Sequence, residues 1–439
     1  MTIPVTTTAL KVGFTLFALL NPLVLRAAPT SLTLKQAIEY AIQHSHTLNS
    51  ASHEVFIADF EKENAKSRFL PSLDLTAKHG IEDSSPSTRV TPWASELSLG
   101  LTETLYDNGN NITQYQISKL KKAQTEISYR KEKDLLCRDV GLEFLQYSLT
   151  TKLLKIQKDQ YGLIKKQYES ISGQYHQGMK TRKDFLRFKT QVSRSDIDLV
   201  TARNVVEKSK RELKRLLAVP IESTDELDFV PDEEKFDAGK LPKNAPSLEQ
   251  HYDFRIAILK KEVNELEASL VRKKYWPEVS LTTGINYGSS NYIDTGSSVE
   301  DNDQVGWNAL ITLKYNLLDW GIRRRDSEIA AQRKAIQGNE LDNNLLSVRS
   351  EVERLMLDLK QLSENFKLSD ELLALEQNNL KLLEQEYRNG KVQYLDLITG
   401  LKDLADAKIK YFTAFYDLKR ALLTYWYHEG KLYESIATK

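Results

Sequence analysis

The feature that most constrains the fold is an internal repeat that spans most of this 439-residue chain. Two unlike motifs recur at the same separation of 212 residues. Leu-Tyr-Asp-Asn-Gly at 105–109 returns as Leu-Leu-Asp-Trp-Gly at 317–321. A tyrosine, a glycine and an aspartate also recur, as Tyr175, Gly178 and Asp184 and then as Tyr387, Gly390 and Asp396. We therefore predict two structural repeats, at 28–218 and 247–432, with a linker between them at 219–246 and a short tail at 433–439.

The distribution of proline predicts that both repeats are mainly helical. None of the eleven prolines lies between Pro92 and Pro220, and none follows Pro277. Proline breaks helices, so long tracts without it favour them. Apolar residues step by four and three from Leu341 to Phe366, and the first copy repeats this pattern more weakly up to Leu163. Such heptads are typical of helices packed in a left-handed supercoil.

The predicted helices are too long for a compact domain. Each repeat opens with a helix, at 32–69 and at 247–275, and later contains a very long one, at 110–172 and at 322–388. At ~1.5 Å per residue, each long helix would extend on the order of 95 to 100 Å. The chain is therefore expected to form a rod or part of a tube.

Between the opening helix and the long helix, each repeat contains two predicted β-strands. Alternating apolar residues run from Leu97 to Leu105 and, more cleanly, from Trp307 to Leu317, and each set has an upstream partner. This alternation is typical of strands with one apolar face. We predict two hairpins with polar loops at 84–92 and 289–304.

Charge and cysteine content exclude several classes of function. The chain has 61 basic and 61 acidic residues, which argues against nucleic-acid binding. Cys137 is the only cysteine, which excludes disulfides and zinc–thiolate clusters, and a buried, inert thiol is expected there. No acid or thiol completes a metal site near His44 and His46. With no catalytic motif either, we expect no enzyme activity and no cofactor.

The first 27 residues resemble a secretory signal peptide. Lys11 precedes an apolar run at 12–25, and a small-residue cleavage site follows at Ala27. No later segment reaches the roughly 18 apolar residues that a membrane helix needs. A membrane role must therefore come from the strands or from a partner.

The predicted strands suit a transmembrane barrel, but four strands are too few to close one. A barrel needs about eight or more, so several copies of the chain would have to combine their strands. Tryptophans near the strand ends match the aromatic girdles of such barrels, with Trp276 and Trp320 at one end and Trp93 and Trp307 at the other. The alternative is ordinary strand-end packing in a small soluble sheet, as part of a periplasmic coiled-coil scaffold protein.

The duplicated order of β-hairpin and helical hairpin resembles the TolC-type outer membrane efflux proteins. The resemblance extends from Ser-Leu-Thr-Leu-Lys-Gln-Ala at 31–37 to the closing stretch at 387–423. It implies a mainly α-helical homotrimer with a 12-stranded β-barrel in the outer membrane lipid and a helical barrel in the periplasm. Such proteins are passive exit ducts of tripartite efflux pumps or of type I secretion. They dock onto a periplasmic adaptor protein and an inner-membrane transporter. The resemblance does not decide whether the exported cargo is a drug, a metal ion or a protein.

The resemblance also assigns roles to residues at the two helical tips. It implies adaptor docking around Gly178, Gly390 and Lys391, and a periplasmic entrance near Tyr387, Asp184 and Asp396. Asp184 is expected to cap its helix with Thr181, whereas Gln393 takes the place of that threonine before Asp396. We therefore expect Asp396 to lack a capping partner and to be freer to face the channel.

At the strand ends, Asp107 and Asp319 are expected to accept hydrogen bonds from free amides at the start of the long helices. Gly109 and Gly321 would allow the sharp turn there.

Overall fold

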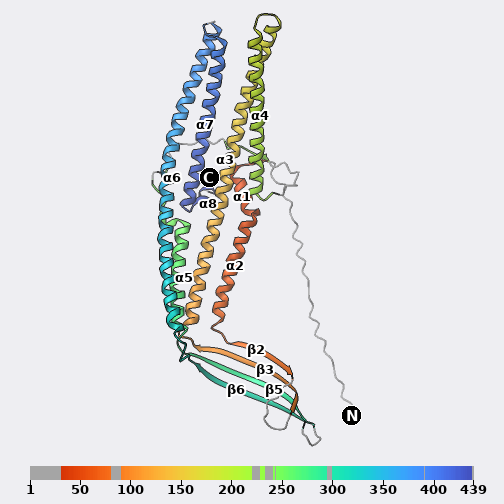
Figure 1. Ribbon diagram of the computed structural model, residues 1–439, viewed down its shortest axis with the longest axis vertical. Helices are drawn as coiled ribbons and strands as arrows, with labels where there is room; N and C mark the ends of the chain where they lie inside the picture. The colour runs from red at the N-terminus through yellow and green to blue at the C-terminus, as the bar shows by residue number, and fades with distance from the viewer. Residues whose placement is uncertain are drawn as a thin grey trace.

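The computed structural model describes residues 31–80, 90–219, 228–232, 241–242, 244–293, 299–389 and 391–437. It is an elongated bundle of helices with a curved four-stranded sheet at one end (Figure 1). The expected signal peptide and most of the linker lie outside the described residues. No described helix is long and apolar enough to cross a lipid bilayer.

Two helices of equal length run from the sheet to the far end of the molecule (Figure 1). They are α3 (Asn110–His176) and α6 (Ile322–Arg388), each of 67 residues, or about 100 Å. Each is followed by a returning helix of 35 residues, α4 (Arg182–Leu216) or α7 (Tyr394–His428). The predicted long helices and helical hairpins are confirmed.

The opening helices of the two repeats pack along the half of α3 and α6 that lies nearer the sheet. They are α1 (Leu34–His44), α2 (His46–Ser67) and α5 (Tyr252–Lys273), the last preceded by a 3-10 turn at Leu248–Gln250. The prediction of a single helix over 32–69 is wrong, because Ser45 has an extended backbone and starts α2 with a new cap. Its hydroxyl accepts a hydrogen bond from the Leu48 amide at 3.3 Å.

The core lies at mid-height, where the two repeats meet. Phe144 and Val140 of α3 are fully buried and belong to one cluster with Tyr416 and Leu423 of α7. Cys137 is buried in the same cluster, and burial raises the pKa of its thiol to about 12. The thiol therefore stays protonated at neutral pH, as expected for an unreactive core residue.

The heptad pattern of α6 marks buried positions correctly. Val348, Val352, Leu355 and Leu359 are each less than a tenth exposed. The pattern fails at Leu163 of α3, which is 42% exposed, although Ile156 and Ile171 of the same helix are buried.

Short elements lie around the middle of the molecule. Two-residue strands β1 (Ser31–Leu32) and β4 (Asp228–Phe229) pair in parallel, and helix α8 (Leu432–Ala437) follows α7. In the linker, the Asp232 backbone carbonyl accepts a hydrogen bond from the Tyr416 hydroxyl at 2.6 Å. The Asp232 carboxylate pairs with Lys419.

All four long strands lie in one antiparallel sheet of order β2-β3-β5-β6. Their bounds are β2 (Ser72–Gly80), β3 (Val90–Tyr106), β5 (Glu278–Ile293) and β6 (Val299–Lys314). Both predicted hairpins are confirmed. The predicted loop over 289–304 is wrong, because β5 extends to Ile293, β6 starts at Val299 and Ser289 pairs with Asp303. The last strand is also shorter than predicted, since Tyr315 and Leu317 follow its end at Lys314.

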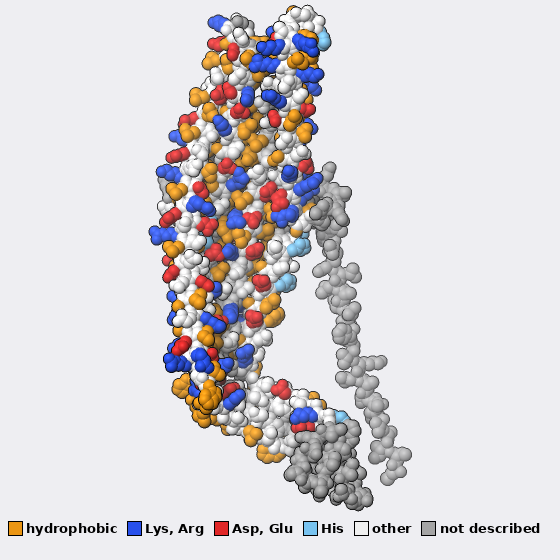
Figure 2. Space-filling view, in the orientation of Figure 1, with side chains coloured by type: hydrophobic (Ala, Val, Ile, Leu, Met, Phe, Trp, Pro, Cys, Tyr) orange, Lys and Arg blue, Asp and Glu red, His pale blue; other side chains and the backbone are white. Residues whose placement is uncertain are grey.

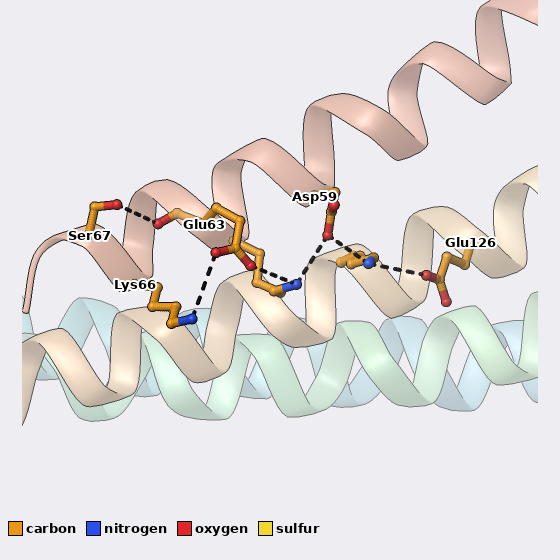
Figure 3. A network of polar contacts seen from close by, with 7 residues as sticks. Asp59, Glu63, Lys66, Ser67 and Glu126 are labelled. Atoms are coloured by element: carbon orange, nitrogen blue, oxygen red, sulfur yellow. Dashed lines mark hydrogen bonds and ion pairs between the residues drawn. The ribbon is translucent and has the colours of Figure 1, made fainter.

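A chain of ion pairs joins α2 to α3 near the sheet (Figure 3). Asp59 accepts from Lys122 at 2.7 Å and from Lys62 at 3.1 Å, and these hydrogen bonds hold the pKa of its carboxyl below the usual value. Lys122 also approaches Glu126. Such exposed pairs orient α2 on α3 more than they stabilise the fold.

Candidate functional site

The sheet has one apolar face and one polar face. Cross-strand neighbours share a face, so the pairing register places the following apolar residues together: Leu73, Leu75, Ala77, Leu97, Leu99, Leu101, Ile285, Tyr287, Val305, Trp307 and Ala309. Within one chain much of this face is open to solvent, with Leu75 70% and Trp307 80% exposed. A contiguous apolar surface of this kind marks a site of contact with lipid or protein.

The opposite face is mainly polar or small. Asp74, Gly100, Gly284 and Asn308 lie in one row across the four strands. The next row includes Gly306, where an added Cβ would lie 2.7 Å from the Asn286 side-chain oxygen. Glycines on this face therefore leave room for polar side chains of neighbouring strands.

The corners between strands and long helices are built alike in both repeats. Asp107 accepts hydrogen bonds from the backbone amides of Gly109, Asn110 and Asn111 at 2.9, 3.1 and 2.7 Å. Asp319 accepts from the amides of Gly321 and Arg323 at 3.1 and 3.0 Å. Gly109 and Gly321 have φ of 73° and 82°. The expected capping role of both aspartates is confirmed.

Two of the predicted membrane-interface tryptophans, Trp276 and Trp320, flank the strands, whereas Trp307 lies midway along β6 opposite Ile285, so its expected place at a strand end is wrong. Trp276 is 62% exposed just before β5, and Trp320 is 81% exposed after β6. Trp320 has a φ of 52°, which is costly for a bulky residue. Trp93 pairs with Asn291 through the backbone, and its side chain lies outside the described residues.

The tip between α3 and α4 is a tight turn with a capped return. Gly178 has a φ of 76°, and the Met179 amide donates to the Gln174 carbonyl at 2.8 Å. The Thr181 hydroxyl accepts from the Asp184 amide at 3.2 Å and donates to its carboxylate at 2.7 Å. This hydroxyl lowers the pKa of Asp184. Asp184 is thus a helix cap, as expected.

The tip between α6 and α7 corrects one expectation. The Asp396 carboxylate accepts a hydrogen bond from the Gln393 backbone amide at 3.1 Å, so Asp396 also caps its helix. The expectation overlooked that the backbone of any residue at position 393 can supply the donor. Asp396 is nevertheless exposed, as are Lys391 and Tyr387. Gly390 lies outside the described residues.

The two tips differ in charge. Figure 2 shows Lys and Arg side chains gathered at the α3–α4 tip. Five exposed basic residues of that tip have uncharged counterparts at the 212-residue spacing: Lys180, Arg182, Lys183, Arg187 and Lys189 correspond to Val392, Tyr394, Leu395, Thr399 and Leu401. The duplication has therefore kept the pair of helices that forms each tip and changed the charge between them.

The family profile for outer membrane efflux proteins matches residues 37–219 and 246–424. The chain belongs to the outer membrane efflux protein family. The fold agrees with this assignment, because the two matched segments carry the same succession of strands, long helix and returning helix. This protein is therefore an outer membrane efflux channel of the TolC type, not an enzyme. The alternative of a periplasmic scaffold protein is set aside.

Solved structures share the fold of this efflux protein at low sequence identity. The Campylobacter jejuni CmeC outer membrane channel is 15% identical with a TM-score of 0.78, covering 91% of this chain and 86% of that one. VceC from Vibrio cholerae is 15% identical with a TM-score of 0.74, covering 90% and 96%. The Neisseria gonorrhoeae MtrE channel is 16% identical with a TM-score of 0.71, covering 92% and 88%. A sequence search of curated proteins gave no match.

Sequence reasoning missed one polar cluster of this efflux protein. His251, Glu351 and His428 come together at mid-height, although they lie on three different helical elements. Nothing in their spacing brings them together. The available signal was local: His251 occupies the N-cap of α5, a position where serine, threonine, aspartate or asparagine is preferred.

Proposed function

We propose that three copies of this efflux protein assemble into a passive exit duct, with a 12-stranded barrel in the outer membrane and a helical tube in the periplasm. The observation that carries the proposal is the two-faced sheet, apolar on one side and polar on the other. Lipid favours an apolar outer face and a water-filled lumen favours a polar inner face.

Closure of the barrel requires partners for β2 and β6, which are the edges of the sheet. Unpaired backbone groups are costly in hydrocarbon, so these edges must pair with other strands. Three sheets of four strands would satisfy both edges of every copy, and a barrel of that size has an interior wide enough for water.

The helices offer a matching surface for self-association. A stripe of exposed leucines follows α6 at intervals of seven and eleven residues: Leu346, Leu357, Leu368, Leu375 and Leu382, each more than half exposed. Residues at these intervals lie on one face of a helix. Helices of adjacent copies packed along this stripe would cover it and extend the tube beyond the barrel.

Trp276 and Trp320 are proposed to lie at the periplasmic interface of the membrane, and Trp93 near the outer one. Their placement at opposite ends of the strands supports this arrangement, and Trp307, midway along the apolar face of β6, is proposed to face the lipid. Tryptophan prefers the headgroup region because its ring is apolar and its N–H is polar. The strained backbone of exposed Trp320 is also consistent with a selected position.

The two helical tips are proposed to dock onto a periplasmic adaptor protein that links the duct to an inner-membrane transporter. Gly178, Gly390 and Lys391 belong to this docking surface. The basic residues of the α3–α4 tip would favour an acidic surface on the adaptor, whereas the α6–α7 tip would contribute more neutral contacts.

Asp396, Tyr387 and Asp184 are proposed to line the periplasmic entrance. In a trimer, three copies of Asp396 near the axis would favour cations. Asp396→Asn removes the charge and keeps an oxygen that can accept the Gln393 amide. It should lower cation selectivity in planar bilayers, whereas the matched change Asp184→Asn should have a smaller effect. Equal effects of both changes would show that cation selectivity does not depend on Asp396 in particular.

Native mass measurement of the detergent-extracted protein tests the assembly. Three copies are expected, and a monomer or dimer would contradict the proposal. Leu357→Asn combined with Leu368→Asn should weaken the trimer, because both side chains belong to the exposed stripe. Lys360→Asn, an exposed residue of the same helix outside the stripe, serves as the control.

A further inference from the structure

The strongest unexplained group of side chains lies where α7 ends and α5 begins, beside α6 (Figure 1). His251 and His428 are buried, each 4% exposed, and their rings are stacked. His251 Nε2 lies 3.0 Å from His428 Nδ1. One nitrogen of each ring and one oxygen of Glu351 lie within 4.8 Å of one another, the only such metal-ligand group among the described residues.

We propose that His251, His428 and Glu351 form a binding site for a divalent transition-metal ion of the zinc type. Two nitrogens bound to tetrahedral zinc at ~2.0–2.1 Å lie about 3.3 Å apart, so the imidazole pair would open by only about 0.3 Å. Glu351 Oε1 lies 3.6 Å from His428 Nε2, the ring nitrogen that does not face His251, and its side chain is 46% exposed, so the carboxylate would swing toward the Nδ1 side to complete the site. Imidazole and carboxylate are ordinary zinc ligands.

Features of His251 that are unfavourable in a purely structural role suit this site. As the N-cap of α5 it makes no side-chain capping bond, and its buried Nδ1 has no hydrogen-bond partner. Asp253 Oδ2 lies 4.0 Å from that nitrogen and is itself paired with Lys131. Histidines that bind metal through one nitrogen commonly direct the other toward a carboxylate. Asp253 is placed to provide this support.

The surroundings allow a metal ion to reach the site. A groove of about 380 Å³ between α6 and α7 is lined by Glu351 and His428 and opens to solvent. Burial lowers the pKa of both histidines, which favours the neutral imidazole that binds metal. Three protein ligands would leave a fourth coordination position open, as in catalytic zinc sites.

The cluster belongs to the second repeat alone. Ser45, the N-cap of α2, stands where His251 stands in the second repeat, and Leu216 corresponds to His428. Ser45 makes the capping bond that His251 lacks. A metal bound only in the second repeat would join α5, α6 and α7, and would stabilise one side of the subunit at mid-height.

Isothermal titration of the intact, detergent-solubilised protein with zinc chloride tests the site. We expect saturable binding of one ion per chain, lost in His251→Gln and in His428→Gln. Glu351→Gln should weaken binding by about tenfold or more. His44→Gln, an exposed histidine of α1, is the control and should bind zinc as the unchanged protein does. Absence of saturable binding, or binding retained by His428→Gln, would overturn the proposal and leave the pair as a packed hydrogen bond.

A second measurement decides the outcome if a histidine variant fails to fold. Cobalt(II) added to the unchanged protein should give the strong visible absorption of a four-coordinate ion, and Glu351→Gln should change that spectrum. Zinc should also raise the midpoint of thermal unfolding of the unchanged protein more than that of Glu351→Gln. Identical behaviour of the two proteins in both measurements would refute the three-ligand site.

Discussion

The contact between the two repeats can be tested at Gly141, where α3 of the first repeat passes α7 of the second. Gly141 is buried, and a Cβ added there would lie 2.9 Å from Leu423 Cδ1. That is closer than carbon atoms normally approach, so Gly141→Ala forces Leu423 to move. Gly162 lies on the same helix with nothing within 4 Å of such an atom, so Gly162→Ala is a matched control.

The expected magnitude combines two effects. Replacing glycine by alanine inside a helix stabilises it by about 0.8–1.0 kcal/mol. Overpacking a buried contact costs about 1–3 kcal/mol. Gly162→Ala should therefore stabilise the protein by about 1 kcal/mol, whereas Gly141→Ala should range from neutral to a loss of about 2 kcal/mol. The difference of about 1–3 kcal/mol is the cost of the Leu423 contact.

Urea unfolding of the detergent-solubilised protein, followed by far-UV circular dichroism, measures both changes. A double-mutant cycle with Leu423→Ala isolates the contact, because the penalty at Gly141 should disappear once the leucine side chain is removed. The reasoning is refuted if Gly141→Ala stabilises as much as Gly162→Ala. It is also refuted if the penalty persists in the Leu423→Ala background.

Three further outcomes are expected. Asp107→Ala removes the acceptor for three amides at the start of α3 and should cost about 0.5–2 kcal/mol in urea unfolding; an unchanged midpoint would contradict this. Burial raises the pKa of Asp134 above its ordinary 3.8, so the folded protein keeps that proton to higher pH than the unfolded chain. The contribution of Asp134 to the free energy of unfolding should therefore fall as pH rises from 3.8 to the folded pKa. When the free energy of unfolding is measured as a function of pH, Asp134→Asn should make it less dependent on pH over that range. Changing Lys180, Arg182 and Lys183 together to glutamine should weaken capture of the periplasmic adaptor and make that capture less sensitive to salt. Unchanged capture would show that these charges do not contribute to docking.

Patterns within the sequence are sufficient to predict the local elements and their duplication. Proline-free tracts and heptads located α3 and α6, and alternation located the strands, because these patterns report which face of one element is apolar. The aspartates at 107 and 319 could also be assigned as caps from the sequence, because a cap acts on amides within four residues. The signal fails at Leu163, which is exposed despite its heptad position, and where charged residues continue a strand, as opposite Ser289.

Which distant elements meet is visible only in the folded chain. The tertiary structure joined the two hairpins through β3 and β5, and it brought His251, Glu351 and His428 to one point from positions up to 177 residues apart. It also showed that Asp396 caps its helix through a backbone amide, a donor that the identity of the side chain at position 393 does not reveal. Contacts of this kind depend on the path of the whole chain and on backbone groups that every residue carries, so no local pattern of side chains specifies them.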